Sequence, residues 1–226
     1  MILNRSGITK NPKILEIGAA QGLFVIACQE LGYTCVGIEP SSNALTVSEL
    51  LKKELKTNIR IDKGFAEYLP YNDESFDLVI ALSVIEHVQD VEKVFAEIFR
   101  VLKRKGSFYF ETTSSLCPKQ DEIRFFPFFS WYPDKIKKKI MVWSMKHKPS
   151  LIGYSDAPAL NWFTPWKTNQ LLKKAGFYKI IDQWDFEVKK SEPIKEHIHK
   201  IIKSNKITKL LAGLFTTSSR YLAIKV

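Results

Sequence analysis

The stretch Ile14-Leu-Glu-Ile-Gly-Ala-Ala-Gln-Gly22 decides the fold that this sequence of 226 residues can adopt. Its first four residues form an apolar run around one acid, which predicts a buried strand, and the glycines after it predict a turn into a helix. A second strand is expected at 34–38, and Glu39 follows its end, 17 residues after Gly22. In an open parallel sheet, ligands bind outside the carboxyl ends of the strands, where a carboxylate can hold a ribose diol. The spacing therefore predicts a site for a nucleoside-containing cofactor.

The loop after the first strand does not have the dinucleotide-binding form Gly-x-Gly-x-x-Gly. Counting from Gly18, the second and third glycine positions hold Ala20 and Leu23, which makes a poor phosphate loop and disfavours a nicotinamide oxidoreductase. The stretch instead has the form acid-x-Gly-x-Ala-x-Gly, from Glu16 to Gly22. This form resembles the first motif of the class I S-adenosylmethionine-dependent methyltransferases, in which the loop wraps the methionine part of the cofactor. Ala20 replaces the middle glycine of that motif and narrows the freedom of the backbone.

A second stretch, residues 64–88, resembles the middle of the same family. It contains Leu-Pro-Tyr at 69–71, Phe-Asp at 76–77 and Glu-His-Val at 86–88. In the family, residues after the third strand flank the adenine. Phe65 departs from the pattern, because family members often carry Asp there to accept a hydrogen bond from the adenine amino group. Adenine recognition would then depend on stacking and on backbone groups around Ala66. The resemblance covers residues 12–113.

The resemblance implies that S-adenosyl-L-methionine is the cofactor and that the loops after four strands bind it. The candidate cofactor-binding residues are Glu16, Gly18, Ala19, Ala20, Gly22, Glu39, Pro40, Phe65, Ala66 and Ser83. A hydroxyl nucleophile must also lose a proton, and His87 is the best placed general base; the alternative is that His87 packs or caps the next helix. For Glu86 two roles stay open: it holds the local loop or assists at the cofactor end, or it takes part in the chemistry. The cysteines and histidines lack metal-ligand spacing, so no metal site is expected.

The predicted fold class is α/β, with a Rossmann-like seven-stranded, mostly parallel sheet, an antiparallel last strand and helices on both faces, in a single domain 1–226. A helix from Asp90, its candidate N-cap, to a stop at Gly106 presents one apolar face. Strands are expected at 107–113, 177–188 and 221–226.

Another helix has clear end signals, with Thr164 as N-cap, Pro165 at the first helical position and Gly176 at the stop. The family commonly has this element before its sixth strand. We expect Trp162 and Trp166, near its start, to pack rather than to contact a ligand.

The net charge of +10 is concentrated in two segments. Residues 114–150 hold eight basic and three acidic residues, and residues 189–209 hold seven and two. Each segment therefore carries +5, and the rest of the sequence sums to zero. They belong to an aromatic and basic insertion at 114–162 and a basic helical insertion at 189–217. Both are expected on the cofactor side of the sheet, where they would attract an anionic partner or only solvate surface helices.

The aromatic insertion leaves three functions open: a lid over the site, contact with an anionic membrane surface, or nucleic-acid binding, the last being disfavoured. We expect a cytoplasmic methyltransferase that can associate with a membrane. Its acceptor would be a small or lipid-linked molecule, with an oxygen nucleophile on an anionic sugar, lipid or quinone-type substrate. The alternative is a non-catalytic, methyltransferase-like binding or scaffold protein.

Overall fold

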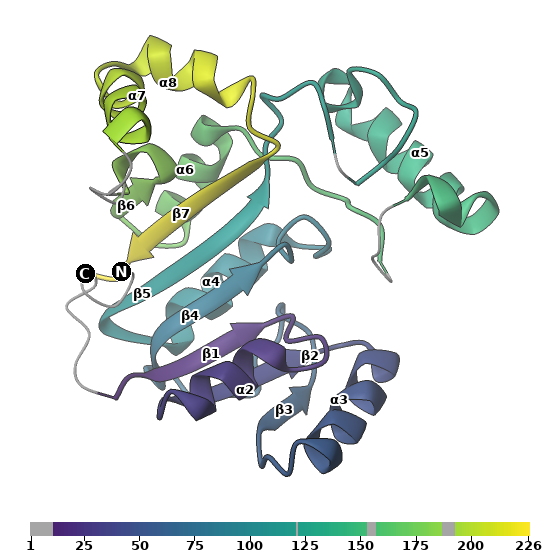
Figure 1. Ribbon diagram of the computed structural model, residues 1–226, viewed down its shortest axis with the longest axis vertical. Helices are drawn as coiled ribbons and strands as arrows, with labels where there is room; N and C mark the ends of the chain where they lie inside the picture. Colours follow the sequence, from purple (N-terminus) through teal and green to yellow (C-terminus); the bar gives the residue numbers. More distant parts are fainter. Residues whose placement is uncertain (1–10, 121, 153–156, 187–192) are drawn as a thin grey trace.

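The computed structural model describes residues 11–120, 122–152, 157–186 and 193–226. Its centre is a seven-stranded sheet in the order β3-β2-β1-β4-β5-β7-β6 (Figure 1). The strands are β1 (Lys13–Ile17), β2 (Thr34–Glu39), β3 (Arg60–Lys63), β4 (Phe76–Leu82), β5 (Leu102–Thr113), β6 (Lys179–Asp182) and β7 (Ser218–Ile224). Only β7 runs antiparallel to its neighbours β5 and β6. The predicted fold class, including the antiparallel last strand, is confirmed.

Both faces of the sheet are apolar, because alternate side chains of a strand point to opposite faces. Leu15 and Val79 belong to the large core on one face, whereas Ile14 and Leu78 belong to a smaller cluster on the other. Helices α4 (Val91–Val101) and α6 (Pro165–Lys174) cover the large core, while α2 (Leu23–Glu30) packs on the opposite face. Helix α3 (Ser42–Glu54) connects β2 to β3. The continuous apolar strands of the sequence are thus explained by burial on two sides.

Helix α4 begins as predicted but ends earlier. The Asp90 side chain caps it by accepting a hydrogen bond from the Lys93 amide, and its apolar face is fully buried. Gly106 does not stop this helix: the helix ends at Val101, and Gly106 lies within β5. A side chain at Gly106 would place its Cβ 2.8 Å from the Lys103 carbonyl oxygen, so the glycine is needed for a close backbone approach instead.

Helix α6 has the predicted ends. Thr164 accepts a hydrogen bond from the Lys167 amide, Pro165 is the first helical residue, and Gly176 has a φ of +106° just beyond the helix. Strand β6 is shorter than predicted, because a 3₁₀ turn (η3, Gln183–Asp185) follows it directly. The last part of the predicted strand, 187–188, lies outside the described residues.

The first insertion leaves the carboxyl end of β5 and carries a short 3₁₀ turn (η1, Phe129–Trp131), helix α5 (Asp134–His147) and a second turn (η2, Pro149–Leu151). It has a small core of its own, around Phe129, Met141 and Trp162. Lys137 is 2% exposed within it: its ammonium group donates to the Ser130 carbonyl oxygen and lies over the Trp162 ring. The insertion projects beyond the sheet in Figure 1.

The second insertion connects β6 to β7. It contains α7 (Pro193–Lys203) and α8 (Lys206–Gly213), which lie beside the β6–β7 edge of the sheet (Figure 1). Lys209 of α8 pairs with Asp182 and Asp185, at the end of β6 and in η3. None of the described helices is long and apolar enough to cross a lipid bilayer.

Candidate cofactor site and a neighbouring pocket

The loop after β1 has the backbone geometry that its sequence predicts. Gly18, Ala20 and Gly22 all have positive φ angles, of 70°, 46° and 87°. At Gly18 an added Cβ would collide with the Val84 side chain, and at Gly22 it would lie 2.7 Å from Ile59. The glycines are therefore required by tertiary contacts as well as by the turn. Ala20 adopts the same left-handed region despite its Cβ, at a modest cost in strain.

Glu39 at the carboxyl end of β2 holds this loop in place. One of its oxygens accepts the Ala20 amide at 2.9 Å, and the other accepts the Ser41 amide at 2.8 Å. Ala19 is buried beside it. A carboxylate has about four lone-pair sites, so each Glu39 oxygen keeps capacity for a ribose hydroxyl.

Glu16 is the clearest polar anomaly of the site. It is 6% exposed, and its Oε2 has no hydrogen-bond partner. Burial, with the charge of Glu39 as a second cause, raises the pKa of Glu16 to about 8. Buried polar atoms normally have a partner, so this carboxyl group is suited to receive a donor, such as the ammonium group of a methionine moiety. The residues present thus fit S-adenosylmethionine: Glu16 and the 18–22 loop would hold its methionine part, and Glu39 would hold its ribose.

The remaining cofactor candidates lie on the loops after β2, β3 and β4. Pro40 and Phe65 are exposed, Ala66 is buried, and Ser83 is exposed with a φ of 54°. Phe65, 62% exposed, is free to stack on a flat ring. Together with the β1 loop these residues lie at one edge of the sheet, because β1, β2, β3 and β4 are parallel neighbours.

Two further residues near this edge, Tyr68 and Val84, were not among the candidates from the sequence. Tyr68 is 70% exposed, with the Lys93 ammonium group 3.2 Å from its ring centre, and it follows Phe65 within the same loop. Val84 locks the β4 loop against Gly18. The aromatic character of Tyr68 was visible in the sequence, whereas the Val84 contact joins loops far apart in the chain and has no local signal.

Glu86 and His87 connect the sheet to the first insertion. The Glu86 side chain accepts a hydrogen bond from the Thr112 hydroxyl, and its carbonyl oxygen accepts the amides of Leu160 and Asn161. The His87 ring hydrogen-bonds to the backbone of Ala157 and Pro158, and burial lowers its pKa. The Nδ1 atom of His87 has no partner. Burial therefore favours the neutral form of His87, and Nδ1 is left able to accept a proton.

Within the described ranges, no three histidine, cysteine, aspartate or glutamate residues are grouped so that they could hold a metal ion.

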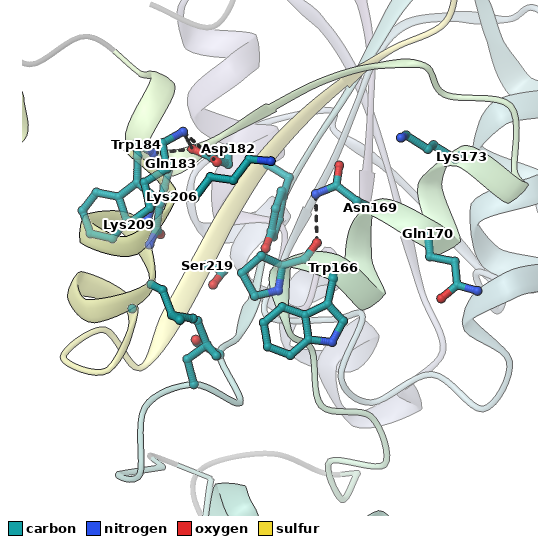
Figure 2. Close-up of a pocket in the computed structure, with 16 residues that line it drawn as sticks. Trp166, Asn169, Gln170, Lys173, Asp182, Gln183, Trp184, Lys206, Lys209 and Ser219 are labelled. Atoms are coloured by element: carbon teal, nitrogen blue, oxygen red, sulfur yellow. Dashed lines mark hydrogen bonds and ion pairs between the residues drawn. The ribbon is translucent and has the colours of Figure 1, made fainter. Parts of the chain in front are cut away.

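A cavity of about 710 Å³ lies between α6, η3, α8 and the beginning of β7 (Figure 2). Trp166 lines it and is 62% exposed, so the expectation that Trp166 packs is wrong, although Trp162 is buried as expected. The helix turns Trp166 away from the insertion core that encloses Trp162. None of the cofactor candidates lines this cavity.

The raised pKa of Glu16 gives the first prediction. Its carboxyl group is neutral in the folded protein up to about pH 8 and ionises near 4.5 when unfolded. Its contribution to stability is therefore complete below pH 4.5 and is lost as the pH rises toward 8. Because Gln has no charge at any pH, Glu16→Gln should flatten the decline of the urea midpoint between pH 5 and pH 9. Glu86, whose pKa burial raises to about 7, remains in both proteins. Parallel profiles would contradict the prediction.

Comparison with known proteins identifies a domain within this chain. Residues 15–110 match the family model described as a methyltransferase domain. An uncharacterized methyltransferase of Bacillus subtilis, YcgJ, is 33% identical over 97 residues, which are 42% of this chain and 38% of that protein. A ubiquinone biosynthesis O-methyltransferase of Bartonella quintana is 31% identical over 103 residues, 46% of this chain and 42% of the relative. The chain thus spans less than half the length of these curated relatives.

Solved structures show the same fold over nearly the whole chain. The crystal structure of Bacillus subtilis YcgJ superposes with a TM-score of 0.60 at 18% identity, covering 99% of this chain and 96% of that one. Phosphoethanolamine N-methyltransferase 2 of Haemonchus contortus, solved in complex with S-adenosyl-L-methionine, gives a TM-score of 0.61 at 19% identity, covering 99% and 51%. The matched domain, the seven-stranded sheet and the loop from Glu16 to Gly22 agree in identifying residues 15–110 as a methyltransferase domain of the class I S-adenosylmethionine-dependent type.

Proposed function

We propose that this protein transfers the methyl group of S-adenosylmethionine to an oxygen nucleophile of an anionic small or lipid-linked acceptor, such as a sugar, lipid or quinone-type molecule. The main observation in support of methyl transfer is the buried Oε2 atom of Glu16, which has no hydrogen-bond partner. It lies beside the 18–22 loop, whose Ala20 amide donates a hydrogen bond to Glu39. The sulfonium supplies the leaving group, so the protein mainly has to align the acceptor with the methyl group.

The charge of the first insertion supports an anionic acceptor. The first insertion starts there, after β5, and presents exposed lysines at 135, 138 and 139. Exposed positive charge raises the local concentration of an anionic substrate. Oxygen is favoured because no Asn-Pro-Pro-Tyr-like motif follows β4. One relative acts on oxygen, a ubiquinone biosynthesis O-methyltransferase, and another is a norajmaline N-methyltransferase, so the atom must be tested directly.

Cofactor binding is tested first, by calorimetry with S-adenosylmethionine and, for comparison, NAD. We expect micromolar binding of the methyl donor alone, abolished by Gly18→Arg, because that side chain would fill the loop. Glu39→Ala should weaken binding by roughly 10- to 100-fold, the value of one or two hydrogen bonds to a charged group.

Gly32→Arg is the matched control for Gly18→Arg. Gly32 also has a positive φ, of 79°, but no atom lies within 4 Å of an added Cβ, so the same substitution should leave cofactor affinity unchanged. Absence of binding to the unmodified protein would overturn the proposed transfer for the isolated chain. The non-catalytic scaffold interpretation would then stand.

His87 is proposed as the base that accepts the proton of the acceptor hydroxyl. His87→Gln should lower kcat by about 10²- to 10⁴-fold with unchanged affinity for S-adenosylmethionine. In the unmodified enzyme the rate should fall only below the lowered His87 pKa, and the variant should lose this acidic limb. Thr112→Val, which removes the hydroxyl that donates to Glu86, tests whether disturbing the neighbouring loop has the same effect. An unchanged pH profile in His87→Gln would assign His87 a purely structural role.

Peripheral contact with an anionic membrane is also proposed. On α7 the exposed Ile194, Ile198 and Ile201 are spaced as one helical face, and lysines accompany them on the same helix. Phe125 and Phe128 of the first insertion are exposed as well. Such a combination binds interfaces through buried apolar area and attraction to anionic headgroups.

Sedimentation with vesicles tests this contact. The protein should sediment with vesicles that contain phosphatidylglycerol and not with pure phosphatidylcholine, and Ile198→Glu should reduce the bound fraction several-fold. Leu50→Glu, an exposed leucine on α3, is the control. Equal losses in the two variants would contradict a role for α7.

A further inference from the structure

The cavity between α6 and α8 has the dimensions of a ligand site. Its volume of about 710 Å³ lies within the range of roughly 300–1,000 Å³ that is common for small-molecule pockets. It opens at the end of the sheet where β5 and β6 finish and β7 begins, since Ser114, Asp182 and Ser219 line it. The cofactor candidates, on the loops after β1 to β4, do not contribute to it.

The walls of the pocket present large aromatic surfaces. Trp166 of α6 is 62% exposed, and Trp184 of η3 is half-buried on the opposite side in Figure 2. Leu210 of α8 lines the same space. At its floor, the buried Tyr221 uses its hydroxyl group to contact Thr168 and Ser219. Indole faces left uncovered in a concave site bind flat rings or alkyl chains well.

The residues that line the pocket carry more positive than negative charge. Asp182 is the acid among the lining residues, and it already pairs with Lys209 and accepts the Trp184 amide. Lys206 makes no ion pair with any residue in the described part of the chain, and neither does Lys173. Figure 2 shows Lys206 beside the Trp184 wall and Lys173 on the far side. An anionic group lying against the Trp184 wall therefore meets an available ammonium group at Lys206.

We propose that this pocket is a binding site for an amphipathic anion, with an aromatic or alkyl body between Trp166 and Trp184 and an anionic group at Lys206. The inference goes beyond methyl transfer, because the site is distinct from the cofactor loop and can be occupied without turnover. A carboxylate, a sulfonate or a phosphate would serve as the anionic group, since each accepts charge-assisted hydrogen bonds from lysine.

Two fluorescent probes that share one ring system separate the roles of charge and shape. 1-Anilinonaphthalene-8-sulfonate carries the anion, and N-phenyl-1-naphthylamine is its uncharged parent. Titrated into the full chain, the sulfonate should bind at one saturable site and more tightly than the parent. Lys206→Met should weaken binding of the sulfonate by about 3- to 10-fold and leave binding of the uncharged probe unchanged.

Asn169→Trp tests the cavity itself. Asn169 of α6 lines the pocket, and Figure 2 shows its side chain donating a hydrogen bond to the Pro165 carbonyl oxygen of its own helix. A large side chain there should fill the space and weaken binding of both probes. Lys138→Met, an exposed lysine of α5 outside the pocket, removes the same charge and should change neither affinity. Thermal midpoints of all variants, compared with that of the unmodified protein, confirm that they fold.

Two results would overturn the proposal. One is unchanged binding of both probes in Asn169→Trp, which would place the probes elsewhere on the protein. The other is an equal loss for both probes in Lys206→Met, which would mean that the lysine supports structure rather than recognises charge. Gly18→Arg separates this site from the proposed function, because it should abolish binding of S-adenosylmethionine and leave the affinities of both probes intact.

Discussion

The attachment of the β1 loop to the end of β2 is the constraint on which the rest of this site depends. The amides of Gly18 and Ala19 both donate to the Ile38 carbonyl oxygen, at 2.9 and 3.1 Å, and the Ala20 amide donates to Glu39. These bonds hold consecutive amides of a turn against one strand end. Because β1 lies between β2 and β4 in the sheet, fixing its loop also fixes the space that a cofactor would enter.

The same region contains two buried carboxyl groups. Glu16 and Glu86 are both almost completely buried, and burial raises the pKa of each. A buried carboxyl group usually has hydrogen-bond partners within the protein or takes part in binding or catalysis. Glu86 is satisfied by Thr112 and anchors the returning chain of the first insertion through its carbonyl oxygen. Glu16 lacks such a partner for Oε2, and this difference is why a cofactor contact is proposed for Glu16 and not for Glu86.

The basic segments of the two insertions, 114–150 and 189–209, carry equal net charge, but their lysines make different contacts. In the first, Lys137 is drawn into a small core, where Asp134 and the Trp162 ring stabilise its ammonium group. In the second, Lys209 is neutralised by two aspartates, and the space left beneath α8 becomes a pocket. Net charge in a sequence therefore indicated where an anion could bind, but the individual pairings decide which lysines remain available to it.

The sequence by itself indicated the succession of strands and helices along the chain, the loop from Glu16 to Gly22 and the caps at Asp90 and Thr164, because these follow from short-range periodicity and local hydrogen bonds. Tertiary structure alone decided the end of α4 before Gly106, the contact of Val84 with Gly18, and the exposure of Trp166. Each of these depends on which residues distant in the chain come into contact. Local patterns carry no information about such contacts, and for that reason the pocket between α6 and α8 appeared only in the folded chain.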